Sequence, residues 1–76
     1  TDGHLYVSDF LNHTIRRVTT EGVVTTLAGL AGTSGSDDGT GSAARFFRPT
    51  ALARNAVGDL FVTDSFNHTV RQITLA

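Results

Sequence analysis

The sequence predicts an all-β protein of antiparallel strands arranged as propeller-type blades. Short segments alternate apolar and polar residues, turn-forming residues separate them, and no long stretch has a helical period. The chain also repeats itself: SDFLNHTIRRVT near the start returns as TDSFNHTVRQIT near the end, with Leu60 in the place of Leu5, an offset of 55 positions. A period of this length holding four short strands is typical of a β-propeller blade.

The first part of the chain is expected to form three strands, Leu5–Asp9, Thr14–Thr19 and Val23–Ala28. In the second of them the apolar residues Ile15 and Val18 are three positions apart, which indicates a β-bulge or a change of face. Between the second and third, Glu21 and Gly22 are typical of a tight hairpin turn.

A long loop is expected next, because residues 30–41 are mostly Gly, Ser, Thr and Asp. One helical turn is expected in residues 43–49, ending where Pro49 restricts the backbone of Arg48. Three more strands follow, namely Pro49–Arg54, Leu60–Asp64 and Thr69–Thr74.

The composition of the chain argues against several classes of function. The 76 residues carry a net charge of −1, and all six basic residues are Arg, so no basic stripe suggests nucleic-acid binding. No apolar run reaches the length of a membrane span, and the absence of Cys excludes disulfides and Cys-ligated zinc. So short a chain is marginally stable alone, which predicts association with copies of itself or with the rest of a longer chain.

The strand Leu5–Asp9 followed by Asn12, His13 and Thr14 resembles the NHL repeat, named after its Asn-His-Leu motif. The segment DDGTGSAARFFRPTALA is similar to the long-loop version of that repeat. The resemblance implies blades of four strands around a central channel. On that template residues 1–29 are strands 2–4 of a first blade, 30–48 the inter-blade loop, and 49–76 strands 1–3 of a second blade.

About one and a half blades leave sheet edges open, and open edges invite pairing. Three interpretations remain: the chain is part of a longer protein, a protomer that completes its sheets with neighbouring copies, or a unit of a fibre.

Large apolar residues stand where the family has small polar ones, or in the loop: Phe10, Leu11, Phe66, Phe46 and Phe47. One interpretation packs them against the adjacent blade. The other makes them a protein–protein interface, since clustered exposed apolar groups mark such surfaces.

Asn12 and Asn67 each begin an Asn-x-Thr sequon, so attached glycans are a hypothesis if the protein is secreted. The alternative is that Asn-His is a structural turn, in which the Asn amide caps backbone groups and the His packs between blades.

Two Asp–His pairs, Asp9 with His13 and Asp64 with His68, are candidates for the family's structural motif rather than for a metal site. Each turn offers two ligands, whereas structural zinc requires four. No Ser or Cys accompanies them in the setting of a catalytic triad.

Asp37 and Asp38 are weak calcium candidates in a Gly-rich loop, although the alternating acids of a calcium loop are missing. The alternative is a loop in which Asp38 bonds its own backbone.

These observations predict a non-catalytic structural and protein-interaction module without a cofactor, extracellular or at the cell surface. Its expected partners are protein, with no nucleic acid and no membrane. The family resemblance leaves two alternatives: a segment of a metal-dependent lyase- or hydrolase-like propeller enzyme, or an RNA-binding propeller.

Overall fold

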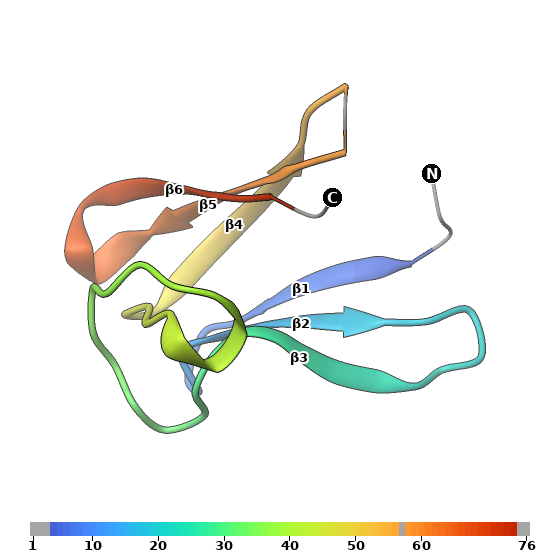
Figure 1. Cartoon of the computed structure of the whole chain (residues 1–76), viewed down its shortest axis with the longest axis horizontal. Coiled ribbons are helices and arrows are strands. Elements are labelled where there is room, and N and C mark those ends of the chain that lie inside the picture. The colour runs from blue at the N-terminus through green and yellow to red at the C-terminus, as the bar shows by residue number, and fades with distance from the viewer. Residues whose placement is uncertain (1–3, 57, 75–76) are drawn as a thin grey trace.

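The computed structural model describes residues 4–56 and 58–74, and it confirms an all-β chain (Figure 1). Within these residues two antiparallel three-stranded sheets follow each other along the sequence. The first holds β1 (Leu5–Asp9), β2 (Thr14–Val18) and β3 (Val24–Gly29), and the second holds β4 (Pro49–Arg54), β5 (Leu60–Asp64) and β6 (Thr69–Ile73). The sheets lie one above the other, and the long loop joins them at one end (Figure 1).

The strand bounds match the alternation in the sequence closely. β1, β4 and β5 have the expected bounds, β2 and β6 end one residue early, and β3 is shifted by one residue at both ends. The register of β2 and β3 shifts between Ile15 and Arg16, where Ile15 faces Ala28 but Arg16 faces Thr26. The extra residue, Leu27, is therefore in β3, whereas the sequence indicated a bulge in β2. β3 ends at Gly29, where a Cβ would lie 2.5 Å from the carbonyl oxygen of His13, so only glycine fits.

The β2–β3 and β4–β5 turns each contain a glycine with positive φ. The Gly22 N–H donates to the Thr19 carbonyl at 3.0 Å, and the Gly58 N–H donates to the Asn55 carbonyl at 3.1 Å. Their φ angles of +87° and +96° belong to the left-handed region, which glycine enters without steric cost. The turn expected at Glu21 and Gly22 is therefore confirmed.

The loop contains a helical turn, but not where the sequence predicted it. A 3-10 turn, η1, spans Gly41–Ala43 and ends where the expected turn begins. Ala44 is already extended, at φ −73° and ψ 153°. The segment after it forms no helical turn: Phe46 is buried between the sheets, the Phe47 N–H donates to Asp64, and Arg48 has a φ of +54°.

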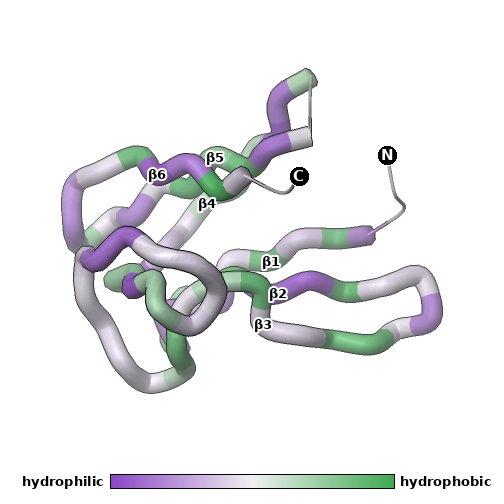
Figure 2. The backbone as a smooth tube through the Cα atoms, viewed as in Figure 1, coloured by the Kyte–Doolittle hydropathy of each residue, from purple (hydrophilic) through white to green (hydrophobic). Residues whose placement is uncertain are grey.

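The core lies between the two sheets, under the loop. Its buried apolar members come from β2, β3, the loop and β5: Ile15, Ala28, Ala44, Phe46, Leu60 and Val62. Figure 2 shows hydrophobic stretches in both sheets, separated by hydrophilic turns. Burying one large side chain of this kind stabilises the fold by about 1.5–3 kcal/mol. The contact between the sheets therefore depends on few residues.

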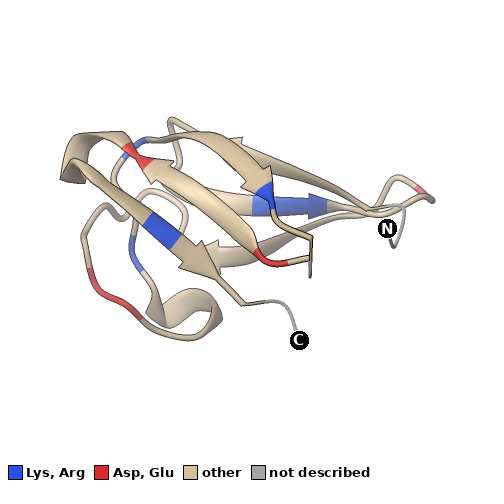
Figure 3. Cartoon of the chain, turned by 90° about the horizontal axis from the view of Figure 1, so that it is seen from above, with Lys and Arg blue, Asp and Glu red and all other residues tan. Residues whose placement is uncertain are grey.

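Charged residues are scattered over strands and loops (Figure 3). Among the described residues, no helix has the length and apolar character needed to cross a bilayer.

Candidate functional site

The internal repeat places two equivalent corners in the structure. The first corner (residues 9–16) joins β1 to β2, and the second corner (residues 64–71) joins β5 to β6 through a 3-10 turn, η2 (Ser65–Asn67). In each, the strand-ending Asp accepts a hydrogen bond from the side-chain amide of the Asn three residues later. This bond measures 3.2 Å at the first corner and 2.8 Å at the second. The Asn thus holds the reversal of the chain, as its turn role predicted.

The histidine of each corner occupies the left-handed region, with φ 59° at His13 and 56° at His68. His13 also contacts the loop: its Nδ1 accepts a hydrogen bond from the Arg48 N–H at 3.1 Å. Its ring lies edge-on to Phe47 at 5.5 Å between centroids. His68 is exposed. The Asp–His pairs therefore have packing and turn roles within the chain.

Asp64 is the buried centre of the second corner. It is completely inaccessible to solvent. Its Oδ1 accepts the Phe47 N–H at 2.7 Å, and its Oδ2 accepts from Asn67 and from Arg71 at 2.8 and 3.0 Å. A buried carboxylate needs such partners, because an unpaired buried charge is strongly destabilising.

Arg71 fastens the loop to the second sheet. Besides Asp64, its guanidinium donates to the carbonyls of Arg45 and Asp37 at 3.0 and 3.1 Å, and to the Asp38 carboxylate at 2.7 Å. The same group lies over the Phe46 ring, 4.9 Å from its centroid. Its charge is therefore matched by two carboxylates, and its donors are used within the chain.

The calcium candidates Asp37 and Asp38 take part in this same arrangement. The Asp37 carbonyl accepts the Arg45 N–H at 2.8 Å in addition to Arg71. The Asp38 carboxylate, although 93% exposed, faces the Arg71 guanidinium. Where a calcium ion would need oxygen ligands, the structure thus places an arginine. Among the described residues, no group of three or more His, Cys, Asp or Glu side chains comes together.

The first corner has the same residues but looser contacts. Arg16 lies 3.6 Å from Asp9, and their side chains are 31% and 29% exposed. The Arg16 Nε is buried and has no hydrogen-bond partner among the described residues. Among the described residues, no loop group bonds the side chains of Asp9, Asn12 or Arg16, whereas the loop bonds all three of their counterparts.

The apolar candidates divide between the core and the surface. Phe47 contacts Phe66 at 5.1 Å, and the Arg48 guanidinium lies over both Phe10 and Phe66 at 5.3 and 5.0 Å. Phe66 remains 51% exposed and Leu11 71%.

Phe46 does not belong to an exposed surface. It is 2% exposed and fills the core between the sheets, so its assignment to an interface was wrong for this chain. Consecutive residues of an extended segment point in opposite directions, so Phe46 turns inward while Phe47 turns toward His13.

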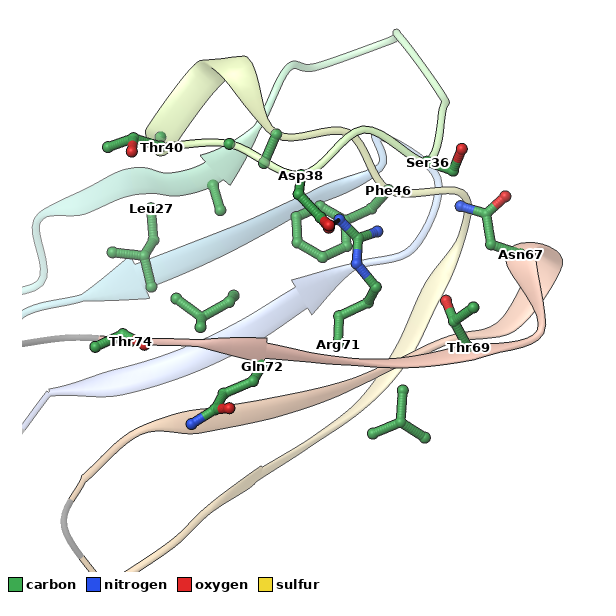
Figure 4. A pocket seen from close by; sticks show the side chains of 16 residues that line it. Leu27, Ser36, Asp38, Thr40, Phe46, Asn67, Thr69, Arg71, Gln72 and Thr74 are labelled. Carbon is green, nitrogen blue, oxygen red and sulfur yellow. Dashed lines mark hydrogen bonds and ion pairs between the residues drawn. The ribbon is translucent and has the colours of Figure 1, made fainter.

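An open cleft of about 1000 Å³ lies between β3, the loop and β6 (Figure 4). Its lining includes Leu27, Asp38, Phe46, Arg71 and Ile73. The Arg71 and Asp38 side chains point toward each other across the cleft (Figure 4). The polar groups at the cleft therefore hold the loop in place and form no recognisable constellation of nucleophile and base.

The two copies also differ in which face is covered. Leu60 and Val62 of β5 are inaccessible, whereas their counterparts Leu5 and Val7 in β1 are 66% and 46% exposed. The opposite holds on the other side, where Ile15 is inaccessible and its counterpart Val70 is 69% exposed. We call the first uncovered surface the N-side face (Leu5, Val7, Asp9 and Arg16) and the second the C-side face (Thr63 and Val70).

The chain is similar to parts of known proteins, although no family model matches it. The chain is 41% identical over 76 residues to part of the Arabidopsis thaliana protein SUPPRESSOR OF QUENCHING 1, chloroplastic. It also resembles part of a crystal structure of a Bacteroides thetaiotaomicron protein named "Putative phosphatase", with 32% identity and a TM-score of 0.84.

Both similar proteins are much longer than the matched segment. The alignments cover 97% and 96% of this chain, but 7% of the Arabidopsis protein and 18% of the Bacteroides chain. The similarity therefore concerns one part of each larger protein.

The repeat in the sequence predicted the Asp-Asn-His corners but not the hydrogen bonds between the second corner and the loop. Arg16 and Arg71 each pair with the Asp that ends the neighbouring strand. The signal was present, since an Arg follows the strand-ending Asp by seven positions in both copies. The sequence did not indicate that a main-chain N–H of the loop bonds Asp64, because this contact depends on the path of the loop.

Proposed function

We propose that the chain is a non-catalytic repeat segment of an NHL-type β-propeller, which works by packing against neighbouring repeats in a larger chain or assembly. The observation that carries this proposal is the contrast between equivalent faces. Leu60 and Val62 are fully buried at the junction of the two sheets, while Leu5 and Val7 leave the same apolar surface open. A surface that is buried in one repeat and open in the next is suited to another repeat.

The repeated Asp-Asn-His corner and the order of the strands support the NHL assignment. In this proposal residues 1–29 and 49–76 belong to two successive blades, and residues 30–48 connect them. The small cores of such repeats are stabilised by their neighbours, because each unit buries its apolar face only by stacking.

The proposal assigns no catalytic role to the chain. The word phosphatase in the name of the Bacteroides protein describes a chain of which this segment covers 18%. Here Arg71, a basic residue at the cleft, is already bonded to Asp64 and Asp38, which leaves a phosphate no free guanidinium at that point.

Location is a separate part of the proposal. The sequence suggested an extracellular or cell-surface protein, whereas the printed name of the Arabidopsis relative is chloroplastic. The relative therefore favours a plastid-related location over an extracellular one.

Glycosylation of Asn67 conflicts with its contacts in the chain. The Asn67 amide donates to both Gly35 and Asp64, and a glycan would replace one of its two hydrogens.

Sedimentation velocity over a range of concentrations tests the proposal. We expect the 76-residue chain to associate, and we expect Leu5→Asp or Val70→Asp to weaken association by about tenfold or more, since each places a charge on an apolar interface. Val23→Asp is the matched control, because Val23 is 55% exposed but lies at the β2–β3 hairpin. A well-folded chain that stays monomeric at every concentration contradicts the proposal.

A further inference from the structure

We infer that Asp9, Asn12 and Arg16 form a docking site for the loop of another repeat of the same kind, supplied from the N-terminal side. This inference rests on the proposed function and names the partner of the N-side face. The occupant is a polypeptide loop with the chemistry of residues 35–48, bound as those residues are bound at the second corner.

The second corner shows what such a loop must offer. Asp64 receives a main-chain N–H from Phe47, and Asn67 donates to the Gly35 carbonyl at 2.7 Å. Arg71 donates to two loop carbonyls and one loop carboxylate. Most of these contacts use the main chain, so they depend on the path of the loop more than on its sequence.

The first corner has the matching side chains in place, but among the described residues their hydrogen bonds and ion pairs are only with one another. Asp9, Asn12 and Arg16 stand 55 positions before Asp64, Asn67 and Arg71. Arg16 is already turned toward Asp9, and its Nε is buried without a hydrogen-bond partner among the described residues. At the second corner the loop bonds the two terminal nitrogens of Arg71. The Arg16 side chain is 31% exposed and its terminal nitrogen has only the 3.6 Å contact with Asp9, so a ligand carrying carbonyl oxygens is favoured here.

The apolar surroundings specify the rest of the ligand. At the second corner, the Phe46 ring packs in the core with Leu60 and Val62 while it lies against the Arg71 guanidinium. At the first corner, Leu5 and Val7 are exposed beside Arg16, which pairs with Val7 across the strands. An aromatic side chain directly before the N–H that binds Asp9 would cover both. The ligand is therefore an Asp- and Gly-containing loop that ends in adjacent aromatic residues.

A tandem protein tests the inference directly. A second copy of residues 22–55 placed immediately before Thr1 keeps the 55-residue spacing and supplies both the loop and a strand beside β1. Hydrogen exchange of the main-chain amides in Leu5–Asp9 is the readout. We expect their exchange to slow by about tenfold or more, toward the rates of Leu60–Asp64.

Two substitutions make the test specific. Replacing the added copy of Phe46 by Ala should reverse most of the protection, as should Asp9→Ala in the tandem protein. Asp9→Ala in the original chain should change exchange less than about threefold, because there the carboxylate is only weakly engaged. Val23→Asp in the original segment serves as the control that leaves protection intact.

The outcomes separate this inference from the proposed function. Unchanged exchange in Leu5–Asp9 of the tandem protein overturns the inference, and so does an equal effect of Asp9→Ala in both proteins. Equal protection of Leu5–Asp9 in the unfused chain at high concentration makes a second copy the occupant; this overturns the inference but leaves the proposed function standing. The proposed function itself fails if the unfused chain stays a folded monomer.

Discussion

The two corners have nearly the same sequence and very different surroundings. At the second, Asp64 is inaccessible and bonded to a main-chain N–H, an amide and a guanidinium. At the first, Asp9 is 29% exposed, and its ion pair with Arg16 spans 3.6 Å. The same short motif is thus a buried structural centre in one place and a half-exposed surface in the other. The loop makes the difference, because at the second corner it bonds the side chains of Asp64, Asn67 and Arg71. At the first corner it contacts His13 and the Asn12 carbonyl instead.

The largest expected difference between the corners is at the aspartates. Asp64→Ala removes a buried charge and leaves Arg71 and the Phe47 N–H without their partner, which should cost about 3–5 kcal/mol of unfolding free energy. Asp9→Ala breaks a partly exposed pair and should cost about 0–1 kcal/mol. Urea denaturation followed by circular dichroism measures both.

The size of the first effect matters for a chain of 76 residues, whose expected total stability is about 4–11 kcal/mol. Asp64→Ala is therefore expected to leave a large unfolded fraction without denaturant. The double variant Asp64→Leu with Arg71→Met removes both charges of the buried pair but still leaves the Phe47 N–H without its acceptor. It should therefore cost less than Asp64→Ala, although not nothing. Equal costs at Asp9 and Asp64 would show that the loop does not distinguish the corners.

In the next comparison the buried residue is in the first copy of the repeat and the exposed one is in the second. Ile15→Ala opens a cavity in the core beside Phe46 and should cost about 2–5 kcal/mol. Its counterpart Val70 is 69% exposed, and Val70→Ala should cost less than about 1 kcal/mol, mostly through strand preference. The urea midpoints of the two variants check this. A large cost at Val70 in dilute solution would mean that the C-side face is covered even in the isolated chain.

Much of this arrangement was predictable, and the comparison of the corners shows where prediction stops. Alternation placed the strands to within one residue, since burial on one face of a sheet has a period of two. The repeat identified both corners, because Asp, Asn and His recur at the same spacing.

Sequence could not say that Asp64 is buried and Asp9 is not, because local residues are the same at both. Burial there depends on a loop whose path is set by tertiary contacts. The path of the loop also decides whether Phe46 or Phe47 enters the core. A one-residue change in the phase of an extended segment exchanges the inward and outward side chains.

The smallest expected difference concerns the two histidines, both of which have positive φ. A left-handed backbone costs a residue with a Cβ about 1–2 kcal/mol, a cost that glycine avoids while losing about 0.5–1 kcal/mol to its greater freedom in the unfolded chain. His68→Gly should therefore stabilise the chain by about 0.5–1 kcal/mol, since the exposed His68 ring has little to lose. His13→Gly loses the hydrogen bond from Arg48 and the edge-on contact with Phe47, each worth about 0.5–1.5 kcal/mol. It should be neutral or destabilising by thermal unfolding. Equal stabilisation of both variants would show that the contacts of His13 with Arg48 and Phe47 contribute nothing to the free energy of unfolding.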